Sequence, residues 1–404
     1  MKTGKFLLLN LLFTVHCSLA QQYGWVNLSS NIPQQYNLHD VHFIGDTGWI
    51  VGGNARVLIT SDGGQSFTTQ YLPDNAGITF SIFMRSSTEG YLVTSTGAIY
   101  HSTDARNGKW TEIENIGSTL YSICFPPAPA TSGYTCGNAG RIWSITGDKV
   151  TFSTNVWTYT LTSICFPETA NEGWVAGEIL YYFKDGNWSD NFEAPGANYY
   201  NSIYLTDNSH GWAVGGSGKI IYTLNGFHWN GQANTNENNL NDVFFINNNE
   251  GWAVGQEVLL HTTNGGSTWK QEAQDLTAGI IFNSVFATDN HHVYVAGNNG
   301  TLLKYTLLTG FDKFAHAPDY MLEQNHPNPF SKTTTISWNC AKSNHQTLKV
   351  FDVFGNAVAT LVDGFRTSGR QIVDFEIKGL PEGVYFYQLQ ADGKVETKKM
   401  TVSR

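Results

Sequence analysis

The sequence contains few charged residues, few cysteines and, after its first 20 residues, no long apolar stretch. Charged residues make up 14% of the 404 positions, well below the roughly 25% of an average soluble domain. Five cysteines occur, and none forms a closely spaced pair of the kind that binds zinc. No apolar run beyond the N-terminus is long enough to span a bilayer. These features argue against a membrane-spanning chain, a zinc-binding domain and a highly charged disordered protein.

Basic residues are also scarce, and the deficit is confined to one part of the chain. The whole sequence has 23 Lys and Arg against 33 Asp and Glu, a net charge of −10. Residues 23–310 hold 10 basic and 23 acidic residues, whereas residues 311–404 hold 11 and 10. Because an anionic domain is repelled by phosphates, we expect neither nucleic acid nor an anionic membrane surface as a partner.

A short phrase of glycine, an aromatic residue and small or branched apolar residues returns seven times. Its clearest copies are residues 211–215 and 251–255, both Gly-Trp-Ala-Val-Gly. The intervals between successive copies range from 38 to 43 residues, and the aromatic positions are Trp49, Tyr91, Tyr134, Trp174, Trp212, Trp252 and Tyr294. A period near 40 residues built from strand-forming residues predicts a β-propeller.

A second column of small polar residues, each followed by a β-branched residue, precedes the aromatic phrase in every repeat. Its members are Asp40, Ser81, Ser122, Ser163, Ser202, Asp242 and Ser284. A polar loop separates the two runs, which predicts a hairpin. A third strand such as residues 219–223 and a more polar fourth strand such as residues 268–272 complete a four-stranded blade. The predicted fold class is all-β, with a seven-bladed propeller over residues 21–312.

The turn between the third and fourth strands carries a motif of its own. Residues 60–67 and 262–269 place Asp62 and Asn264 before a Gly-Gly pair and a closing aromatic residue. They resemble the Asp-box of bacterial neuraminidase repeats, and residues 102–110 and 223–229 are degenerate versions. Asp or Asn bonds its own backbone in such a turn and glycine takes positive φ. We therefore interpret these side chains as turn-formers and not as catalytic groups.

The two ends of the repeat region complement each other. The last repeat ends near Thr301–Tyr305 without a fourth strand. Residues Trp25–Leu28, which precede the first repeat, have the pattern of an unpaired fourth strand. We predict that the N-terminal strand joins the seventh blade, because closure removes the exposed sheet edges.

Residues 1–20 are typical of a signal peptide. Lys2 and Lys5 precede the apolar residues 6–13, and Ser18-Leu19-Ala20 gives a small-x-small cleavage site before Gln21. The mature chain is therefore expected to be an exported, soluble monomer without a membrane span.

Four cysteines remain after processing, and export permits disulfides. They are Cys124, Cys136, Cys165 and Cys340. Cys124 and Cys136 fall on neighbouring strands of the third blade, which makes them the best disulfide candidates. The alternative is that all four are small apolar core residues.

The repeat stops after residue 312, and a different pattern follows. Residues 313–320 are interpreted as a linker and residues 321–404 as a separate domain with short alternating strands. Turn signals at residues 354–356 and 381–383 separate some of these strands, so the pattern predicts a small antiparallel β-sandwich.

Four motifs follow one another in this C-terminal segment. They are Leu-Glu-Gln-Asn-His-Pro-Asn-Pro-Phe at 322–330, Val-Phe-Asp-Val-Phe-Gly at 350–355, Leu-Pro-Glu-Gly-Val-Tyr at 380–385 and Lys-Lys-Met-Thr-Val at 398–402. The segment resembles the C-terminal sorting domain of the Bacteroidetes type IX secretion system. This resemblance implies an Ig-like sandwich that addresses a periplasmic protein to the outer membrane, with the secretion machinery and its sortase as partners. It also implies removal of the domain near the linker and a secreted or cell-surface product.

The propeller has relatives as well. The repeats, with Gly-x-Gly-Lys-Ile-Ile-Tyr-Thr at 216–223, resemble the photosystem II assembly-factor propellers and the wider family of Asp-box repeat proteins. This resemblance implies a seven-bladed binding platform and carries no photosynthetic role to an exported chain.

The sequence offers little support for catalysis. A sialidase needs arginines to hold its substrate carboxylate, and residues 23–310 contain only Arg56, Arg85, Arg106 and Arg141. No serine-nucleophile motif, phosphate-binding loop or metal cluster is recognisable, because His291 and His292 have no second cluster at ligand spacing. We expect a protein that is not an enzyme and uses no cofactor. The alternative is an extracellular glycan-active enzyme, such as a glycoside hydrolase, with a carboxylate pair at the channel mouth.

A binding site has a predicted location even though its ligand, a protein or a glycan, is unknown. Inner strands of a propeller surround a central channel, and loops at one end form the usual binding face. The position just before the small polar column varies between blades. We select His39, Tyr121, Asn201 and Asn241 from it as candidate ligand-binding residues at the channel mouth.

Overall fold

The computed structural model describes residues 23–156, 159–189, 199–234, 236–308, 320–340, 343–391 and 394–403. The predicted signal peptide and all but the last residue of the predicted linker lie outside these residues. The chain divides into two compact units after Leu308, and each unit is described by itself.

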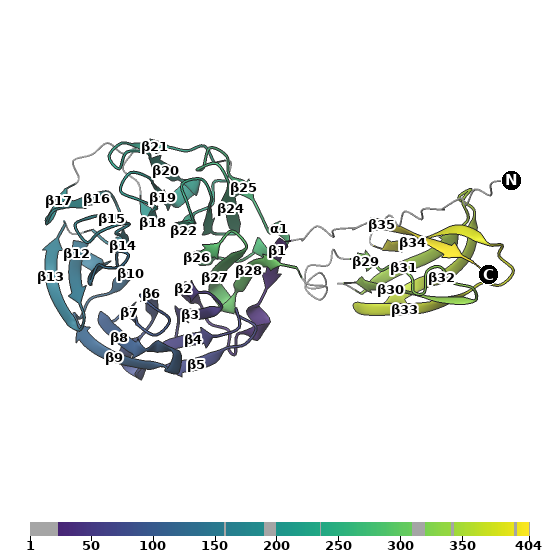
Figure 1. The fold of residues 1–404 in the computed structure, drawn as a ribbon, viewed down its shortest axis with the longest axis horizontal. Helices are drawn as coiled ribbons and strands as arrows, with labels where there is room; N and C mark the ends of the chain where they lie inside the picture. The colour runs from purple at the N-terminus through teal and green to yellow at the C-terminus, as the bar shows by residue number, and fades with distance from the viewer. Residues whose placement is uncertain are drawn as a thin grey trace, which may run out of the picture. The chain divides into compact units, whose positions relative to one another are not determined.

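Seven four-stranded antiparallel sheets form a ring in the described part of the first unit (Figure 1). The innermost strands are β2 (Leu38–Ile44), β6 (Thr79–Met84), β10 (Leu120–Cys124), β14 (Leu161–Cys165), β18 (Tyr200–Leu205), β22 (Leu240–Phe245) and β26 (Phe282–Asp289). The second strands are β3 (Thr47–Gly52), β7 (Gly90–Thr94), β11 (Ser132–Gly137), β15 (Glu172–Gly177), β19 (Gly211–Gly215), β23 (Gly251–Gly255) and β27 (His292–Gly297).

The outer half of each blade consists of a third strand and a more exposed outermost strand. The third strands are β4 (Arg56–Thr60), β8 (Ala98–Asp104), β12 (Arg141–Thr146), β16 (Leu180–Lys184), β20 (Ile220–Thr223), β24 (Val258–Thr262) and β28 (Leu302–Leu307). The outermost strands are β5 (Thr68–Tyr71), β9 (Lys109–Asn115), β13 (Lys149–Asn155), β17 (Asn187–Ser189), β21 (Trp229–Gly231), β25 (Lys270–Gln271) and β1 (Tyr23–Asn27). Short helical turns complete the unit: α1 (Gln274–Thr277), η1 (Ser29–Asn31), η2 (Asp74–Ala76), η3 (Ala105–Asn107), η4 (Asn138–Gly140), η5 (Gly216–Gly218) and η6 (Asn298–Gly300).

The ring closes through the N-terminal strand, as the sequence predicts. β1 pairs antiparallel with β28, with Trp25 opposite Tyr305. The Trp25 side chain is buried, and its Nε1 donates to Glu272 Oε2 at 2.8 Å. The seventh blade is therefore built from both ends of the propeller sequence, and β1 covers the outer edge of β28.

Close packing explains why the repeated phrase begins and ends with glycine. The Trp252 ring is buried between two blades. A Cβ atom on Gly251 would lie 2.4 Å from the Phe245 ring, and one on Gly255 would lie 1.9 Å from the carbonyl oxygen of Asn239. Both glycines are therefore required by the approach of the inner strand and not by an unusual φ angle.

The predicted turn-forming role of Asp62 and Asn264 is confirmed. Asp62 Oδ1 accepts bonds from Thr60 Oγ1 at 2.7 Å and from the Ser66 N–H at 2.9 Å. Asn264 Oδ1 accepts the N–H of Thr268 at 2.9 Å in the same way. These carboxylate and amide groups are used within their own turns.

The disulfide predicted between Cys124 and Cys136 is not formed. Cys124 and Cys136 are both free thiols. Cys136 lies opposite Ser122 and Cys124 opposite Tyr134, so the two cysteines do not face each other across the hairpin. Cys124 Sγ instead accepts the N–H of Phe166 in the next blade at 3.4 Å. A hydrogen bond with Cys124 and burial together raise the pKa of Cys165. These contacts agree with the alternative that the sequence left open, in which the cysteines are small apolar core residues.

The second unit is a β-sandwich of two antiparallel sheets. One contains β29 (Tyr320–Leu322), β30 (Thr333–Cys340) and β33 (Gly369–Glu376). The other has the order β32 (Ala357–Arg366), β31 (Asn344–Phe351), β34 (Gly383–Ala391) and β35 (Lys394–Val402). The core between the sheets includes Trp338, Leu348, Tyr387 and Met400, and Trp338 Nε1 donates to Gln346 Oε1 at 2.7 Å.

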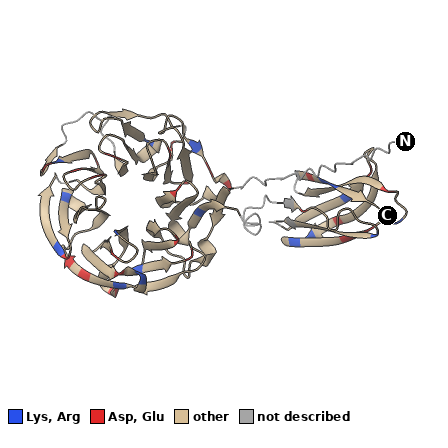
Figure 2. Ribbon diagram, viewed as in Figure 1, with Lys and Arg blue, Asp and Glu red and all other residues tan. Residues whose placement is uncertain are grey.

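Charged residues of both signs are spread thinly over the propeller ribbon (Figure 2). In the portion of the chain that the structure describes, no helix has the length and apolar character needed to cross a membrane.

Candidate functional site

A β-bulge occurs near the start of every innermost strand of the propeller. In β2 the pairing register shifts between Leu38 and Asp40, and the other six blades repeat this shift at the equivalent position. A bulge re-aims the side chain of its extra residue. The extra residue and the next one therefore both line the central channel. We call the extra residues the mouth ring, which consists of His39, Phe80, Tyr121, Thr162, Asn201, Asn241 and Asn283.

The structure brings the four sequence-selected residues together. His39, Tyr121, Asn201 and Asn241 come from four different blades and line one cavity of about 230 Å³ on the propeller axis. All four are half-buried. Their convergence on the channel follows from the ring geometry, because equivalent positions of all blades meet there.

One side of the mouth ring is aromatic. The ring centroids of His39 and Phe80 are 5.1 Å apart in an edge-to-face arrangement, and those of Phe80 and Tyr121 are also 5.1 Å apart. Burial lowers the pKa of His39, so its imidazole is neutral at neutral pH. Phe80, which the sequence argument did not select, joins the two selected rings into one continuous arc.

The other side of the mouth ring consists of a hydroxyl and three amides. Each donates to a carbonyl oxygen of the next blade. Thr162 Oγ1 donates to Tyr200 at 2.8 Å, Asn201 Nδ2 to Leu240, Asn241 Nδ2 to Phe282 and Asn283 Nδ2 to Leu38, each at 2.7 Å. The amides of Asn201 and Asn241 are thus fixed in place. Each keeps a carbonyl oxygen and a second N–H that bond nothing else among the described residues.

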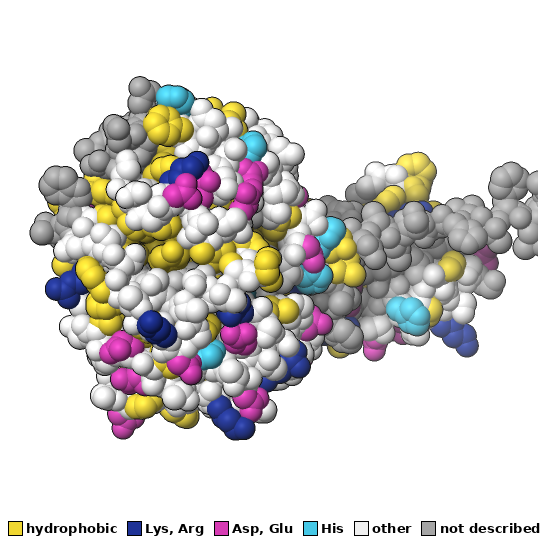
Figure 3. Space-filling model, turned by 60° about the vertical axis from the view of Figure 1, so that its left-hand side comes forward, with side chains coloured by type: hydrophobic (Ala, Val, Ile, Leu, Met, Phe, Trp, Pro, Cys, Tyr) yellow, Lys and Arg dark blue, Asp and Glu magenta, His cyan; other side chains and the backbone are white. Residues whose placement is uncertain are grey.

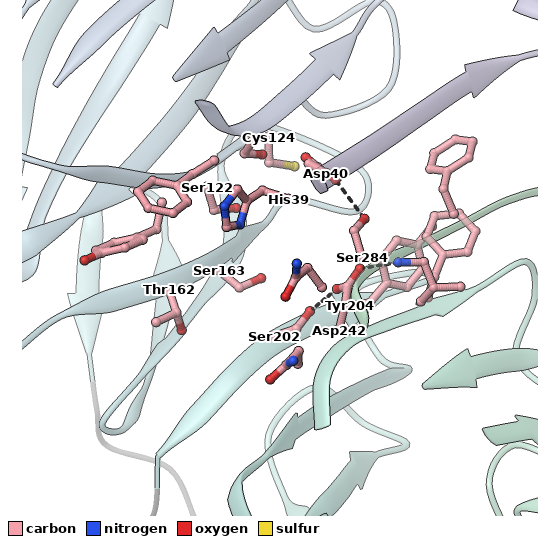
Figure 4. Close-up of a pocket in the computed structure, with 18 of the residues that line it drawn as sticks. His39, Asp40, Ser122, Cys124, Thr162, Ser163, Ser202, Tyr204, Asp242 and Ser284 are labelled. Atoms are coloured by element: carbon pink, nitrogen blue, oxygen red, sulfur yellow. Dashed lines mark hydrogen bonds between the residues drawn. The ribbon is translucent and has the colours of Figure 1, made fainter. Parts of the chain in front are cut away.

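The small polar column forms a second ring below the mouth. Asp40 Oδ2 accepts the N–H of Ile82 at 2.9 Å, and Asp242 Oδ2 accepts that of Val285 at 2.8 Å. The serines of neighbouring blades make the same kind of contact. Ser284 Oγ donates to Asp40 Oδ1 at 2.9 Å, and Ser202 Oγ donates to Asp242 Oδ1 at 2.7 Å (Figure 4). This ring joins adjacent inner strands, which explains why its residue type is uniform.

Two half-buried carboxyl groups lie in this second ring with no lysine or arginine beside them. Burial raises the pKa of Asp40, and burial raises the pKa of Asp242 to about 7, with the charge of Asp40 adding to the effect. No lysine or arginine is among the residues that line the cavity. The channel is therefore unsuited to an anionic ligand.

A third layer of mostly aromatic side chains lies deeper in the channel. It consists of His42, Phe83, Cys124, Cys165, Tyr204, Phe244 and Phe286. The centroids of His42 and Phe286 are 4.5 Å apart and those of Tyr204 and Phe244 are 4.6 Å apart. Burial lowers the pKa of His42 to about 4, so its imidazole is neutral at neutral pH.

Asp242 gives the propeller a distinct dependence of stability on pH. In the unfolded chain its carboxyl ionises near the ordinary value of 3.8, whereas in the folded chain it ionises at about 7. Between these values only the unfolded state has lost the proton, so raising the pH favours unfolding. At 1.4 kcal/mol per pKa unit, the wild type should lose about 3 kcal/mol relative to Asp242→Asn between pH 4 and pH 7. Denaturant unfolding of both proteins across that range measures this difference, and a difference that does not change with pH would contradict it.

His291 and His292 lie where the chain turns from β26 into β27. Asp289 accepts the N–H of His291 at 2.7 Å, and its carboxylate lies 2.9 Å from His292 Nδ1 in an exposed turn. Within the described ranges, no group of three or more His, Cys, Asp or Glu side chains is placed to hold a metal ion.

A closed ring of seven four-stranded sheets around an axial channel defines a seven-bladed β-propeller. The family described as Photosynthesis system II assembly factor YCF48 matches residues 20–257, 184–277 and 232–306. The chain belongs to this family. The family described as Secretion system C-terminal sorting domain matches residues 325–403. That domain directs the chain to the cell surface or beyond through the type IX secretion machinery.

Three solved structures illustrate the fold. YCF48 bound to D1 peptide is 21% identical, with a TM-score of 0.57 over 70% of this chain and 94% of that chain. YCF48 from Cyanidioschyzon merolae is 16% identical, with a TM-score of 0.59 over 70% and 99%. The WD40 β-propeller domain of Doa1 is 11% identical, with a TM-score of 0.58 over 72% and 99%. At these identities the likeness establishes the fold alone. No curated protein matches the chain.

Proposed function

We propose that the chain is an exported, non-enzymatic binding protein whose mouth ring holds an uncharged ligand, with glycans as the preferred class. The observation that carries this proposal is the division of the mouth ring into an aromatic arc and an amide arc around one cavity. Aromatic faces pack against the apolar face of a ligand, while amides offer both a donor and an acceptor. A sugar ring presents apolar C–H groups and hydroxyls that suit this combination.

Charge and size support a small neutral group as the part that enters the channel. No lysine or arginine lines the cavity, and Asp40 and Asp242 lie below the mouth, which disfavours anionic sugars. Its volume of about 230 Å³ is below the roughly 300–1,000 Å³ of pockets that hold drug-sized molecules. A terminal sugar residue would therefore enter, and the rest of the ligand would lie on the surface outside.

Apolar side chains outside the mouth offer contact area for that remainder. Ile78, Tyr159, Tyr199 and Ile281 are each more than a third exposed, and each lies one or two residues before an innermost strand. Hydrophobic side chains gather in a band on the propeller surface seen in Figure 3, and single charged side chains lie around it. A protein segment is the second ligand class, because a propeller of the same family has been solved with bound D1 peptide.

The enzymatic alternative rests on the same two carboxyl groups. Asp40 and Asp242 both line the channel, and an acid with a raised pKa is what a glycosidase uses as its proton donor. Each carboxyl group, however, accepts backbone N–H groups and a serine hydroxyl from the blades around it. Because the carboxyl oxygens of Asp40 and Asp242 already bond groups of neighbouring blades, we interpret their role as structural.

A ligand screen with product analysis tests the proposal. The purified full chain is exposed to arrays of neutral glycans, anionic glycans and peptides, and bound material is analysed for cleavage. We expect retention of neutral glycans without cleaved product. Release of a shortened glycan that is lost in Asp40→Asn or Asp242→Asn would support the enzymatic alternative. Failure to retain any of the three classes would overturn the proposal.

A further inference from the structure

Exposed apolar side chains are concentrated in the smaller of the two units. Among the described large hydrophobic residues that are more than half exposed, only Tyr71 and Leu224 belong to the propeller. The others, all in the C-terminal sorting domain, are Val353, Phe354, Phe365, Ile372 and Val395. Single exposed apolar residues are ordinary, but their concentration in one small domain points to contact with a partner.

Phe354 is the most exposed of these side chains, and a rigid turn presents it. It lies between β31 and β32 and is 86% exposed. Asp352 Oδ1 accepts the N–H of Phe354 at 2.9 Å and that of Asn356 at 2.8 Å. Asp352 Oδ2 also accepts Asn356 Nδ2 at 3.0 Å. Because the turn is held by its own polar groups, a partner that binds Phe354 does not have to order it first.

A small pocket adjoins the turn. Its volume is about 330 Å³, and its lining includes Phe351 and Val353 from the turn side and Phe386 from β34. Phe351 and Phe386 are paired across β31 and β34. The polar part of the lining comes from Asp352, Gln388 and Thr397. An exposed ring therefore lies next to a partly apolar hollow at one end of the sheet, so the domain offers both a projecting and a receiving feature.

We propose that Phe354 and the adjoining pocket are the surface by which the type IX secretion machinery recognises this domain, with the Phe354 ring entering an apolar socket of the machinery. The surface comprises fewer than ten residues, compared with roughly 20–30 residues a side in a stable interface. It is too small for a stable dimer with a second copy of the chain. A surface of this size suits a brief contact. A transported cargo needs such a contact because the machinery must release the cargo again. The proposal rests on the sorting-domain match and is independent of the ligand of the propeller.

Secretion of point variants in the native host tests this assignment. The amount of the protein in the medium and on the cell surface is compared with the amount retained in the periplasm. Phe354→Ser should lower the exported fraction about tenfold or more and raise the periplasmic fraction, as expected for loss of a central anchor. Phe354→Leu keeps an apolar side chain and should be exported nearly normally.

Phe365→Ser is the matched control, because Phe365 is 70% exposed but lies at the opposite end of β32 from the turn. Export of the control at the wild-type level, with loss of Phe354→Ser, supports the proposal. Wild-type export of Phe354→Ser would overturn it, and so would equal loss of both serine variants. Thermal unfolding of purified Phe354→Ser should match the wild type, and a loss of export that accompanies unfolding would also count against the proposal.

Discussion

Replacing Gly255 with alanine is expected to destabilise the propeller by about 3 kcal/mol or more, the upper end of the usual cost of overpacking. The added Cβ would lie 1.9 Å from the carbonyl oxygen of Asn239. That oxygen belongs to the backbone and accepts the N–H of Gln256 at 2.9 Å, so it cannot move aside without loss of this bond. The midpoint of chemical unfolding of the variant measures the cost.

Gly231→Ala is the control for this substitution. Gly231 ends the outermost strand β21, and a Cβ atom there would meet no atom within 4 Å. Its stability should stay within about 0.5 kcal/mol of the wild type. If both alanine variants were equally stable, the close approach of inner and second strands would not be the reason for the repeated glycine.

Truncating Trp25 to alanine should destabilise the propeller by about 3–5 kcal/mol, as for other large buried side chains. Trp25 is 5% exposed and packs with Trp252 and Leu303 in the core of the seventh blade. Its loss also leaves Glu272 Oε2 without the 2.8 Å bond from the indole. Because β1 is the strand that closes the ring, we expect unfolding of the variant to begin at the seventh blade.

Hydrogen exchange resolved along the chain can follow that opening. Exchange should accelerate first in β28 and β27 of the variant, and only later in the third and fourth blades. Phe152→Ala removes a half-exposed aromatic ring from the outermost strand β13 and should cost about 1 kcal/mol without local opening of the seventh blade. Equal costs for the two truncations would show that closure by β1 adds nothing to stability.

The repeat made the propeller predictable from sequence because its conserved spacing has a direct packing cause. Glycine recurs at the Gly251 and Gly255 positions of most blades because the inner strand lies close to both. The Trp252 position holds Trp or Tyr in every blade because a large ring fills the core there. The closing role of Trp25 follows from the same pattern, because one strand is missing at one end of the repeats and one is left over at the other.

The details of the channel were less accessible to sequence reasoning. The position of His39 and Tyr121 at the mouth follows from the column that they occupy, but the β-bulge that turns them inward has no signature in the residues themselves. The bonds that link Asn201 and Asn241 to the next blade join residues about 40 positions apart and depend on the ring being closed. The disulfide prediction failed for a related reason, since hairpin register places Cys136 opposite Ser122.

The affinity of a mouth variant for the glycan found in the screen tests the central claim most directly. Calorimetric titration compares the wild type with Tyr121→Ala, which removes one end of the aromatic arc, and with Tyr71→Ala, which removes a 67% exposed ring from the outermost strand β5. We predict that Tyr121→Ala raises Kd about tenfold or more, as for a central aromatic contact, and that Tyr71→Ala leaves Kd unchanged. The same Kd for all three proteins would contradict a binding site at the channel mouth.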